Sequence, residues 1–213
     1  MILLAAIPDL LTAAGFLLVW LRTDLTGPQW VATGVATMLL EFFVVHASGF
    51  FAVVMYGDSP RAKRVLYLAG LASLYLLLIS GFAWGFHAWW MIGAFFWLSL
   101  GKMLTAWQVP TKGRSFEQQF NQQFMAMAAW ALSVAVYLGA VAAGSMLDLP
   151  AYGVTPEVTT AAGFDVSSSG DWESKPYRAL ATGAIYFAAM GVLRTLLRLL
   201  LLLLHKKDTA AVI

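Results

Sequence analysis

The sequence predicts an all-α integral membrane protein with about six transmembrane helices. Two observations favour this fold class. Of the 213 residues, 61% are hydrophobic and only 11% are charged, whereas a soluble domain carries about 25% charged residues. The apolar residues also occur in runs of about 20, the length needed to cross a hydrocarbon core about 30 Å thick. Backbone groups in lipid must be paired within each segment, so these runs predict helices and exclude the short alternating strands of a barrel.

The predicted spans follow one another along a single transmembrane domain, residues 1–213. They lie near 3–21, 31–56, 65–86, 88–108, 122–146 and 178–204. The first run has neither the basic start nor the cleavage pattern of a signal peptide, so we interpret it as a retained helix. Pro8 and Asp9 interrupt it, which leaves open a short interfacial helix leading into a span that begins at Pro8.

The connections between the runs differ in length. Gly85, Phe86 and His87 leave room only for a tight turn, so the third and fourth runs are expected to form an antiparallel hairpin. The longest connection, the outer loop 147–177, is too long for a bare turn. Its segment VTPEVTT is rich in β-branched residues and predicts a short strand. A folded cap over the bundle, a surface for docking a partner, and disorder all remain open for this loop.

Small residues recur at four-residue spacing on the fifth run, which favours close helix packing in lipid. They are Ala131, Ala135, Gly139 and Ala143, and the sixth run repeats the pattern with Ala184 and Ala188. Ordinary packing within the bundle explains this stripe, and self-association of two copies is the alternative.

The lysines and arginines predict the orientation, because they concentrate on the cytoplasmic side of a membrane. Seven of them share one side of the predicted bundle: Arg61, Lys63, Arg64, Lys112, Arg114, Lys206 and Lys207. Only Arg22, Lys175 and Arg178 lie on the other side. Both termini are therefore expected in the cytoplasm, with the loop 147–177 outside, in a bacterial inner membrane.

Ionisable groups inside a span cost several kcal/mol, so each one predicts a compensating partner or a function. The five candidates are Asp9, Glu41, His46, Lys102 and Arg194. At about 1.5 Å per residue, they fall in the inner half of the membrane, at comparable depths. They are therefore candidates for one intramembrane polar layer.

The second run is the most informative of the spans. Thr37, Glu41 and Ser48 lie on one face at four- and seven-residue spacings and predict a polar stripe. His46 lies about 140° around the helix from Glu41, on a side with aromatic residues. A histidine in that setting is more often a packing residue than a ligand.

The fourth run carries Ser99, Lys102 and Thr105 at three-residue spacing. The simplest assignment is an ion pair between Glu41 and Lys102, which either pins two helices together or lines a route for protons, ions or a polar solute. Snorkelling of Lys102 to the cytoplasmic surface is a further alternative. Arg194 is expected either at the phospholipid headgroups or in a pair with Asp9 or Glu41.

Several classes of site have no support in the sequence. The chain has no cysteine, and it lacks the motifs of nucleophilic, phosphate-binding and dinucleotide-binding sites, so no catalytic residue and no cofactor is predicted. Its three histidines fall at different depths, which does not suit two axial haem ligands or a metal site. A net charge of +2 gives no reason to expect nucleic-acid binding.

Three classes of function remain. The leading hypothesis is a small channel or transporter that moves protons, ions or a small solute through the polar layer. The second is a non-catalytic subunit of a larger membrane complex, with a partner subunit or a second copy as its binding partner. The third is a membrane enzyme or a protein that binds lipid or quinone, using the aromatic faces around His46 and Trp97.

Overall fold

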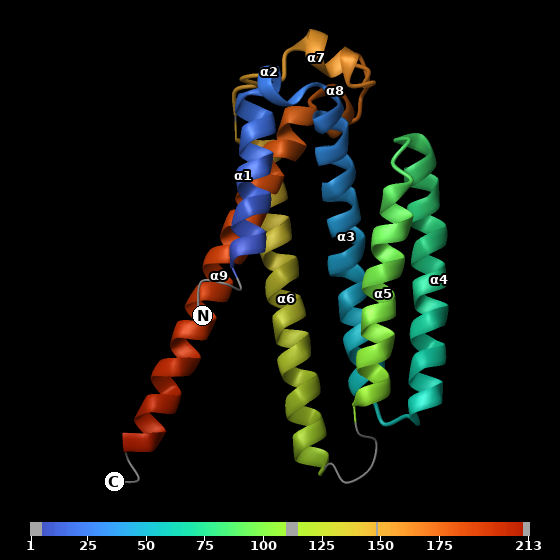
Figure 1. Cartoon of the computed structure of the whole chain (residues 1–213), viewed down its shortest axis with the longest axis vertical. Coiled ribbons are helices and arrows are strands. Elements are labelled where there is room, and N and C mark those ends of the chain that lie inside the picture. The colour runs from blue at the N-terminus through green and yellow to red at the C-terminus, as the bar shows by residue number, and fades with distance from the viewer. Residues whose placement is uncertain (1–5, 110–114, 148, 211–213) are drawn as a thin grey trace. The chain divides into compact units, whose positions relative to one another are not determined.

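The computed structural model describes residues 6–109, 115–147 and 149–210, and it contains helices but no strand among these residues. Figure 1 labels the helices α1 (Ile7–Leu21), α2 (Thr23–Thr26), α3 (Gln29–Tyr56), α4 (Arg61–Gly85), α5 (Trp90–Gln108), α6 (Phe116–Met146), α7 (Pro156–Ala161), α8 (Asp171–Ser174) and α9 (Pro176–Ala210). The predicted all-α class is confirmed. Residues 3–5 of the first predicted span, and also Lys112 and Arg114, lie outside the described residues.

Four of the helices are long and apolar enough to cross a membrane, namely α3, α4, α6 and α9. They indicate a membrane-embedded protein whose apolar helices contact lipid. The helix α1 has 15 residues, or about 22 Å, which is shorter than a hydrocarbon core of about 30 Å. The helix α5, which carries the polar residues Lys102 and Gln108, also falls outside this group.

The chain divides into two compact units. Unit 1 comprises Met1–Val35 and Val136–Ile213, and unit 2 comprises Ala36–Ala135.

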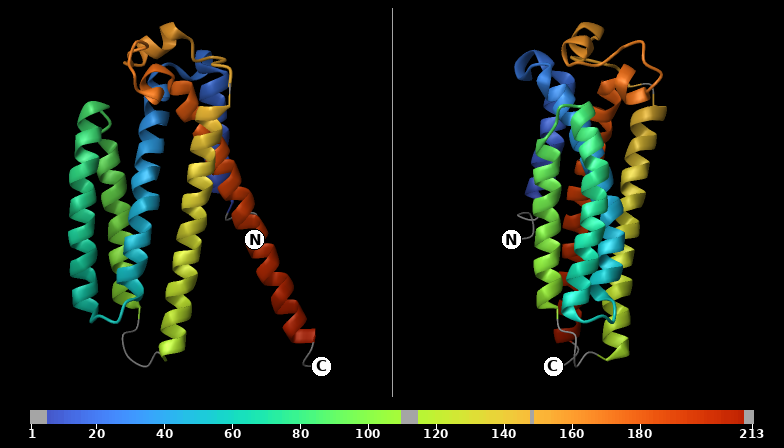
Figure 2. Two further views of the ribbon diagram at one scale, coloured as in Figure 1. Left: turned by 180° about the vertical axis from the view of Figure 1, so that it is seen from behind. Right: turned by 90° about the vertical axis from the view of Figure 1, so that its right-hand side faces the viewer.

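In unit 1, α1 and α9 pack side by side (Figure 2). Two glycines of α9 make this close approach possible. A Cβ atom on Gly183 would lie 2.4 Å from the ring of Phe16, and one on Gly191 would lie 2.9 Å from Leu10 Cδ2. Both distances are shorter than any van der Waals contact, so only glycine fits at these two positions without movement of the neighbours.

The helix α6 also packs through a glycine in unit 1. A Cβ atom on Gly144 would lie 2.1 Å from Thr182 Oγ1 and 3.0 Å from the backbone oxygen of Arg178. The predicted small stripe is not the packed face, because Ala131, Ala135 and Gly139 are exposed and a Cβ on Gly139 would meet no atom within 4 Å. The buried face of α6 in this unit is marked by Tyr137, Ala140 and Gly144.

The outer loop is folded where the structure describes it, and it packs on the end of α1. The backbone N–H of Gly153 donates to the carbonyl of Trp20 at 3.1 Å, and Trp20 Nε1 donates to the carbonyl of Pro150 at 3.0 Å. The predicted strand in VTPEVTT is wrong, because Pro156–Ala161 forms the helix α7. Proline at the first helical position and the side chain of Thr155, which accepts from the Val158 N–H, start a helix there despite the β-branched residues.

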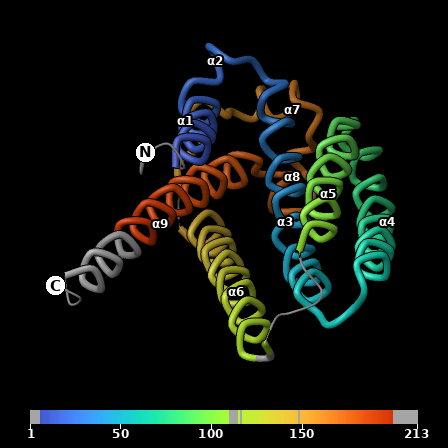
Figure 3. Tube along the Cα trace, turned by 60° about the horizontal axis from the view of Figure 1, so that its bottom comes forward, coloured from blue at the N-terminus to red at the C-terminus, as the bar shows by residue number. Residues whose placement is uncertain are grey.

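In unit 2, α4 and α5 pack against each other as the expected hairpin (Figure 3). The turn at residues 86–89 is closed by backbone hydrogen bonds, including Phe86 N–H to the Phe82 carbonyl at 2.9 Å. His87 adopts a left-handed conformation with φ of 51° there. The buried core of the unit is apolar and includes Phe43, Phe51, Leu68, Tyr75, Ile79 and Phe95.

Arg64, in the first turn of α4, is fully buried in unit 2. Its guanidinium donates to the carbonyl of Met55 at 2.8 Å and to the carbonyl of Val109 at 3.0 Å. These carbonyls belong to the C-terminal ends of α3 and α5, where intrahelical donors run out and the helix dipole is negative. The sequence suggested a cytoplasmic surface residue at this position, whereas the structure has a buried charge that joins three helices.

Candidate functional site

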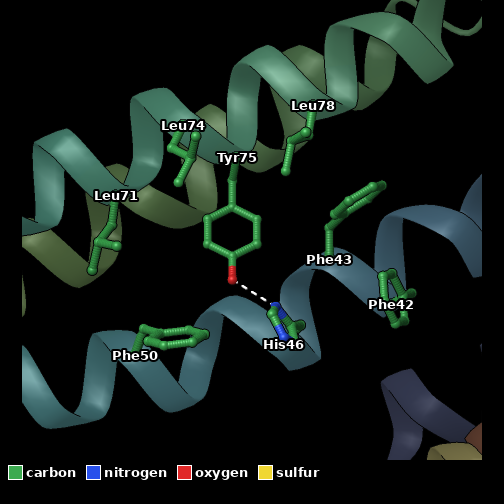
Figure 4. Close-up of a pocket in the computed structure, with 8 residues that line it drawn as sticks. All are labelled: Phe42, Phe43, His46, Phe50, Leu71, Leu74, Tyr75 and Leu78. Atoms are coloured by element: carbon green, nitrogen blue, oxygen red, sulfur yellow. Dashed lines mark hydrogen bonds between the residues drawn. The ribbon is translucent and has the colours of Figure 1, made fainter.

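The candidate site is a groove in unit 2 between α3 and α4. It has a volume of about 360 Å³ and is lined by Phe42, Phe43, His46, Phe50, Leu71, Leu74, Tyr75 and Leu78. The lining residues recur at three- and four-residue intervals on each helix, so each helix presents one apolar stripe to the groove. Figure 4 shows Tyr75 extending from α4 toward His46 on α3.

A hydrogen bond between His46 Nδ1 and the hydroxyl of Tyr75, 2.6 Å long, joins the two helices within the groove. The tyrosine is 5% exposed, whereas the histidine is exposed on the open side of the groove. The tyrosine ring also packs against buried Phe95 of α5, with 5.9 Å between centroids. Tyr75 is therefore held by the core behind it, and it fixes the orientation of the imidazole.

Aromatic rings surround the imidazole on α3. Phe42 stacks on His46 with 5.9 Å between centroids and 15° between planes, and Phe50 meets it edge-on at 5.4 Å. Phe42 and Phe50 are 43% and 48% exposed. This confirms the prediction that His46 shares a helix face with these phenylalanines. The result is an apolar surface around one polar ring.

The face of α3 beside the groove is closed by Trp130 of α6. Trp130 Nε1 donates to the carbonyl of Val45 at 3.0 Å, and a Cβ atom on Gly49 would lie 2.6 Å from the indole. Val45 and Gly49 are buried, in contrast to His46 and Phe50 beside them. The groove face of α3 is thus exposed while the neighbouring face is packed.

Among the residues predicted for the polar layer, the structure brings Asp9 and Arg194 together. In unit 1, Arg194 Nη1 lies 2.8 Å from Asp9 Oδ2, with the carboxylate buried and the arginine side chain 48% exposed. No hydrogen bond from the described residues reaches that oxygen, so the contact is an ion pair without an aligned N–H. Of the alternatives left open for Arg194, the pair with Asp9 is the one observed.

The expected pair of Glu41 and Lys102 is not among the ion pairs between described residues. Glu41 is partly buried, whereas Lys102 is exposed. The predicted ridge on α5 does not lie on one packed face, because Ser99 is buried and Thr105 is exposed with its hydroxyl bonded to the Gly101 carbonyl at 2.9 Å.

Within the stripe predicted on α3, Ser48 is satisfied by its own helix. The hydroxyl of Ser48 donates to the carbonyls of Val44 and Val45 at 2.6 and 3.0 Å. Thr37 is partly buried on the same helix. Hydroxyls that bond to the preceding turn in this way satisfy their donors locally and do not by themselves form a pathway.

No cluster of three or more metal-ligating side chains occurs among the described residues. No protein-family model, no curated protein and no solved structure matches this chain. The interpretation of the site therefore depends on its own geometry.

Sequence reasoning missed Tyr75 and the groove that it helps to form. The tyrosine lies 29 positions from His46, and its surroundings on α4 are leucines that resemble any lipid-facing stretch. A signal was present, because a tyrosine within a span needs a hydrogen-bond partner. Identifying the partner required the register between α3 and α4, which a single sequence does not give.

Proposed function

We propose that this membrane protein binds a lipid-soluble molecule in the groove between α3 and α4. One observation supports this most directly: an apolar groove of about 360 Å³, open on one side, contains a single histidine with a fixed orientation. Ligand sites are typically cavities of about 300–1,000 Å³ lined by apolar and aromatic residues, with a few oriented polar groups. Exposed Phe42, Phe50, Leu74 and Leu78 would be in contact with lipid tails, so a lipophilic ligand would enter sideways from the bilayer.

Filling the groove tests this proposal. Leu78 lines it and Leu77 does not, although both are exposed leucines of α4 at neighbouring depths. The protein is purified in detergent, extracted with organic solvent, and the extract is analysed by mass spectrometry. We expect wild type and Leu77→Trp to release the same lipophile in near-stoichiometric amount, and Leu78→Trp to release much less. Equal lipid content in all three proteins would contradict a ligand site in the groove.

A transport role is the second candidate, supported by the buried carboxylate of Asp9 and its ion pair with Arg194. Buried charges in membrane proteins often mark routes for protons or ions, and Glu41 is a partly buried carboxylate in an apolar helix. Proton flux into proteoliposomes is measured for wild type, Asp9→Asn, Glu41→Gln and the exposed control Glu117→Gln. Flux lost in the first two variants and kept in the control would support transport. Absence of flux from well-folded wild type would end this candidate.

We propose further that α1 and α5 also cross the membrane, which would give six spans with both termini in the cytoplasm of a bacterium. The asymmetry of lysines and arginines supports this orientation. The absence of cysteine permits a clean test with single-cysteine variants at two exposed serines, Ser169 in the outer loop and Ser115 before α6. A membrane-impermeant maleimide added to intact cells should label Ser169→Cys and not Ser115→Cys. The reverse result would invert the orientation.

A further inference from the structure

The hydrogen bond of Tyr75 determines which nitrogen of His46 carries the proton. The buried phenol has no other hydrogen-bond partner among the described residues. Either tautomer leaves one donor unpaired, the Tyr75 O–H or the His46 Nε2–H, but a phenol O–H is the stronger donor and an imidazole nitrogen the stronger acceptor, so we assign the bond as the O–H donating to Nδ1. This assignment also leaves the unpaired donor on the exposed histidine, where a ligand can reach it. A neutral imidazole that accepts at Nδ1 carries its hydrogen on Nε2.

His46 Nε2–H is then the one side-chain donor left unused in the groove. The phenol of Tyr75 is engaged, and the other lining residues are phenylalanines and leucines. Lipid tails offer no acceptor, so the donor is unsatisfied until a ligand brings one. A ligand with an oxygen acceptor gains this hydrogen bond. A cationic ligand finds no negatively charged partner, because the lining of the groove includes no carboxylate.

The depth of His46 and Tyr75 in the membrane limits which molecules could supply the oxygen acceptor. His46 lies about 15 Å along α3 from its nearer end, Tyr56, and Tyr75 lies about 15 Å along α4 from its nearer end, Gly85. With 28 and 25 residues, α3 and α4 are longer than a hydrocarbon core about 30 Å thick. When the helices are centred in the core, both side chains lie about 10 Å inside it, below the ester oxygens of phospholipids at the interface. The acceptor must therefore belong to a molecule whose polar group enters the hydrocarbon region.

The shape of the site favours a flat polar group. The imidazole is flanked by Phe42 on one side and Phe50 on the other. Aromatic faces attract flat rings by stacking, worth about 0.5–1.5 kcal/mol beyond burial. A ring with a carbonyl oxygen at its edge could stack here while it accepts a hydrogen bond from Nε2.

On this basis we propose that the ligand is a quinone with an apolar tail, one of whose ring carbonyls accepts a hydrogen bond from His46 Nε2. This inference depends on the proposed lipophile site and adds the chemical class of the ligand. Tyr75 acts as a positioning residue, because it holds the histidine in the tautomer that donates toward the groove.

The test compares two probes that share a tail and differ in oxygen content, 2-decyl-1,4-benzoquinone and decylbenzene. Binding to the full-length protein in lipid nanodiscs is measured by calorimetry, with empty nanodiscs subtracted. In wild type we expect the quinone to bind about tenfold more tightly than decylbenzene. His46→Phe, which keeps an aromatic ring, should remove that preference. Tyr75→Phe should reduce it, and Tyr67→Phe, a change at an exposed tyrosine of the same helix, should leave it intact.

The outcomes separate the two proposals. If neither probe binds wild type above the nanodisc background, the lipophile site itself is wrong. If both probes bind equally, or if His46→Phe keeps the preference for quinone, the groove binds lipophiles but the assignment of a quinone is overturned.

A measurement on the wild-type protein does not depend on the folding of variants. The chain has only three histidines, so ¹⁵N-histidine labelling gives few signals, and His205→Gln and His87→Asn identify the signal of His46. We expect His46 to carry its proton on Nε2 before ligand is added, and the Nε2–H signal to shift on addition of the quinone and not of decylbenzene. A proton on Nδ1, or an unchanged Nε2–H signal with quinone bound, would overturn the inference.

Discussion

The two units of the chain pack their helices by different means. In unit 1, glycines bring backbones together, as where Gly183 faces the ring of Phe16 and Gly144 faces Thr182. In unit 2, Gly49 makes room for the indole of Trp130, but elsewhere large side chains fill the space between helices, and buried Arg64 ties two helix ends to a third. Close backbone packing leaves little room between helices, whereas packing through phenylalanine, leucine and tyrosine leaves a groove where a stripe is not covered. The candidate ligand site accordingly lies in unit 2.

The two units also differ in what their arginines contact. Arg194 of unit 1 is half-exposed and meets the carboxylate of Asp9, whereas Arg64 of unit 2 is buried among backbone carbonyls. A carbonyl at a helix end is a fixed, partly negative acceptor that requires no second charge. The charge of Arg64 is thus used to hold helix ends, and a change there is expected to have a larger effect than a change at the half-exposed arginine.

The largest expected effect is from Arg64→Met, which keeps the length of the stem and removes both hydrogen bonds. Two buried carbonyls lose a charged donor, and such bonds contribute about 1.5–3 kcal/mol each. We expect a loss of about 3 kcal/mol in the free energy of unfolding, measured by titration from mild detergent into dodecyl sulfate. Arg61→Met, at an exposed arginine of the same first turn, is the control and should change stability by less than about 0.5 kcal/mol.

Arg64→Lys separates charge from geometry. A lysine has one compact ammonium and cannot reproduce the planar fork that reaches two carbonyls. An intermediate loss is expected. Full stability in Arg64→Met would contradict the role of this residue in joining α3, α4 and α5.

The packing in unit 1 should be broken by a single methyl group at Gly144. Its new Cβ would overlap Thr182 Oγ1 and press on the carbonyl of Arg178, a backbone atom that cannot move alone. Overpacking of this kind costs about 1–3 kcal/mol. We expect Gly144→Ala to destabilise the protein by about 2 kcal/mol in the same titration.

Gly139→Ala is the matched control on the same helix, because its Cβ would meet no atom within 4 Å. Alanine is also the better helix former, by about 1 kcal/mol in water, so this variant should be neutral or slightly more stable. Equal stability of Gly144→Ala and Gly139→Ala would contradict the inference that α6 and α9 are too close at Gly144 to accommodate a methyl group.

The sequence was sufficient to locate the apolar helices. The predicted runs 31–56 and 88–108 match α3 and α5 to within two residues at each end. The start of α6 was missed by six residues, since the helix begins at Phe116 and not at 122. Hydropathy detects the part of a helix that suits lipid, whereas the same helix begins earlier, in the polar stretch FEQQFN at 116–121.

The contacts between helices were harder to predict, because they depend on register and rotation. The prediction for α6 chose the regular stripe through Gly139, and the packed glycine is Gly144, off that stripe. Depth alone suggested that Glu41 would meet Lys102, but rotation leaves Lys102 exposed. The pairs Asp9–Arg194 and His46–Tyr75 join residues far apart in the chain, and only the first had been considered as an alternative.

The smallest effect is expected in the outer loop of unit 1, and it depends on pH. The carboxylate of Asp165 accepts hydrogen bonds from the hydroxyl of Ser167, 2.7 Å away, and from the Ser167 N–H at 2.8 Å. These bonds hold the pKa of Asp165 below its ordinary value. A carboxylate with a lowered pKa stabilises the folded loop above the pKa of the unfolded chain, and this contribution is lost as pH falls through the lower, folded value.

Hydrogen exchange of the Ser167 amide, corrected for its intrinsic rate, reports on this turn. Below pH of about 4, the ordinary range of an aspartate, we expect exchange at Ser167 to accelerate. Asp165→Asn should raise the exchange at neutral pH and flatten its pH dependence, because an amide does not titrate over this range. Amides in the packed part of α9, such as that of Ala181, should show no matching change. An equal acceleration in α9 would mean that the loop and the glycine-packed helices open together, so that unit 1 responds to acid as one cooperative unit.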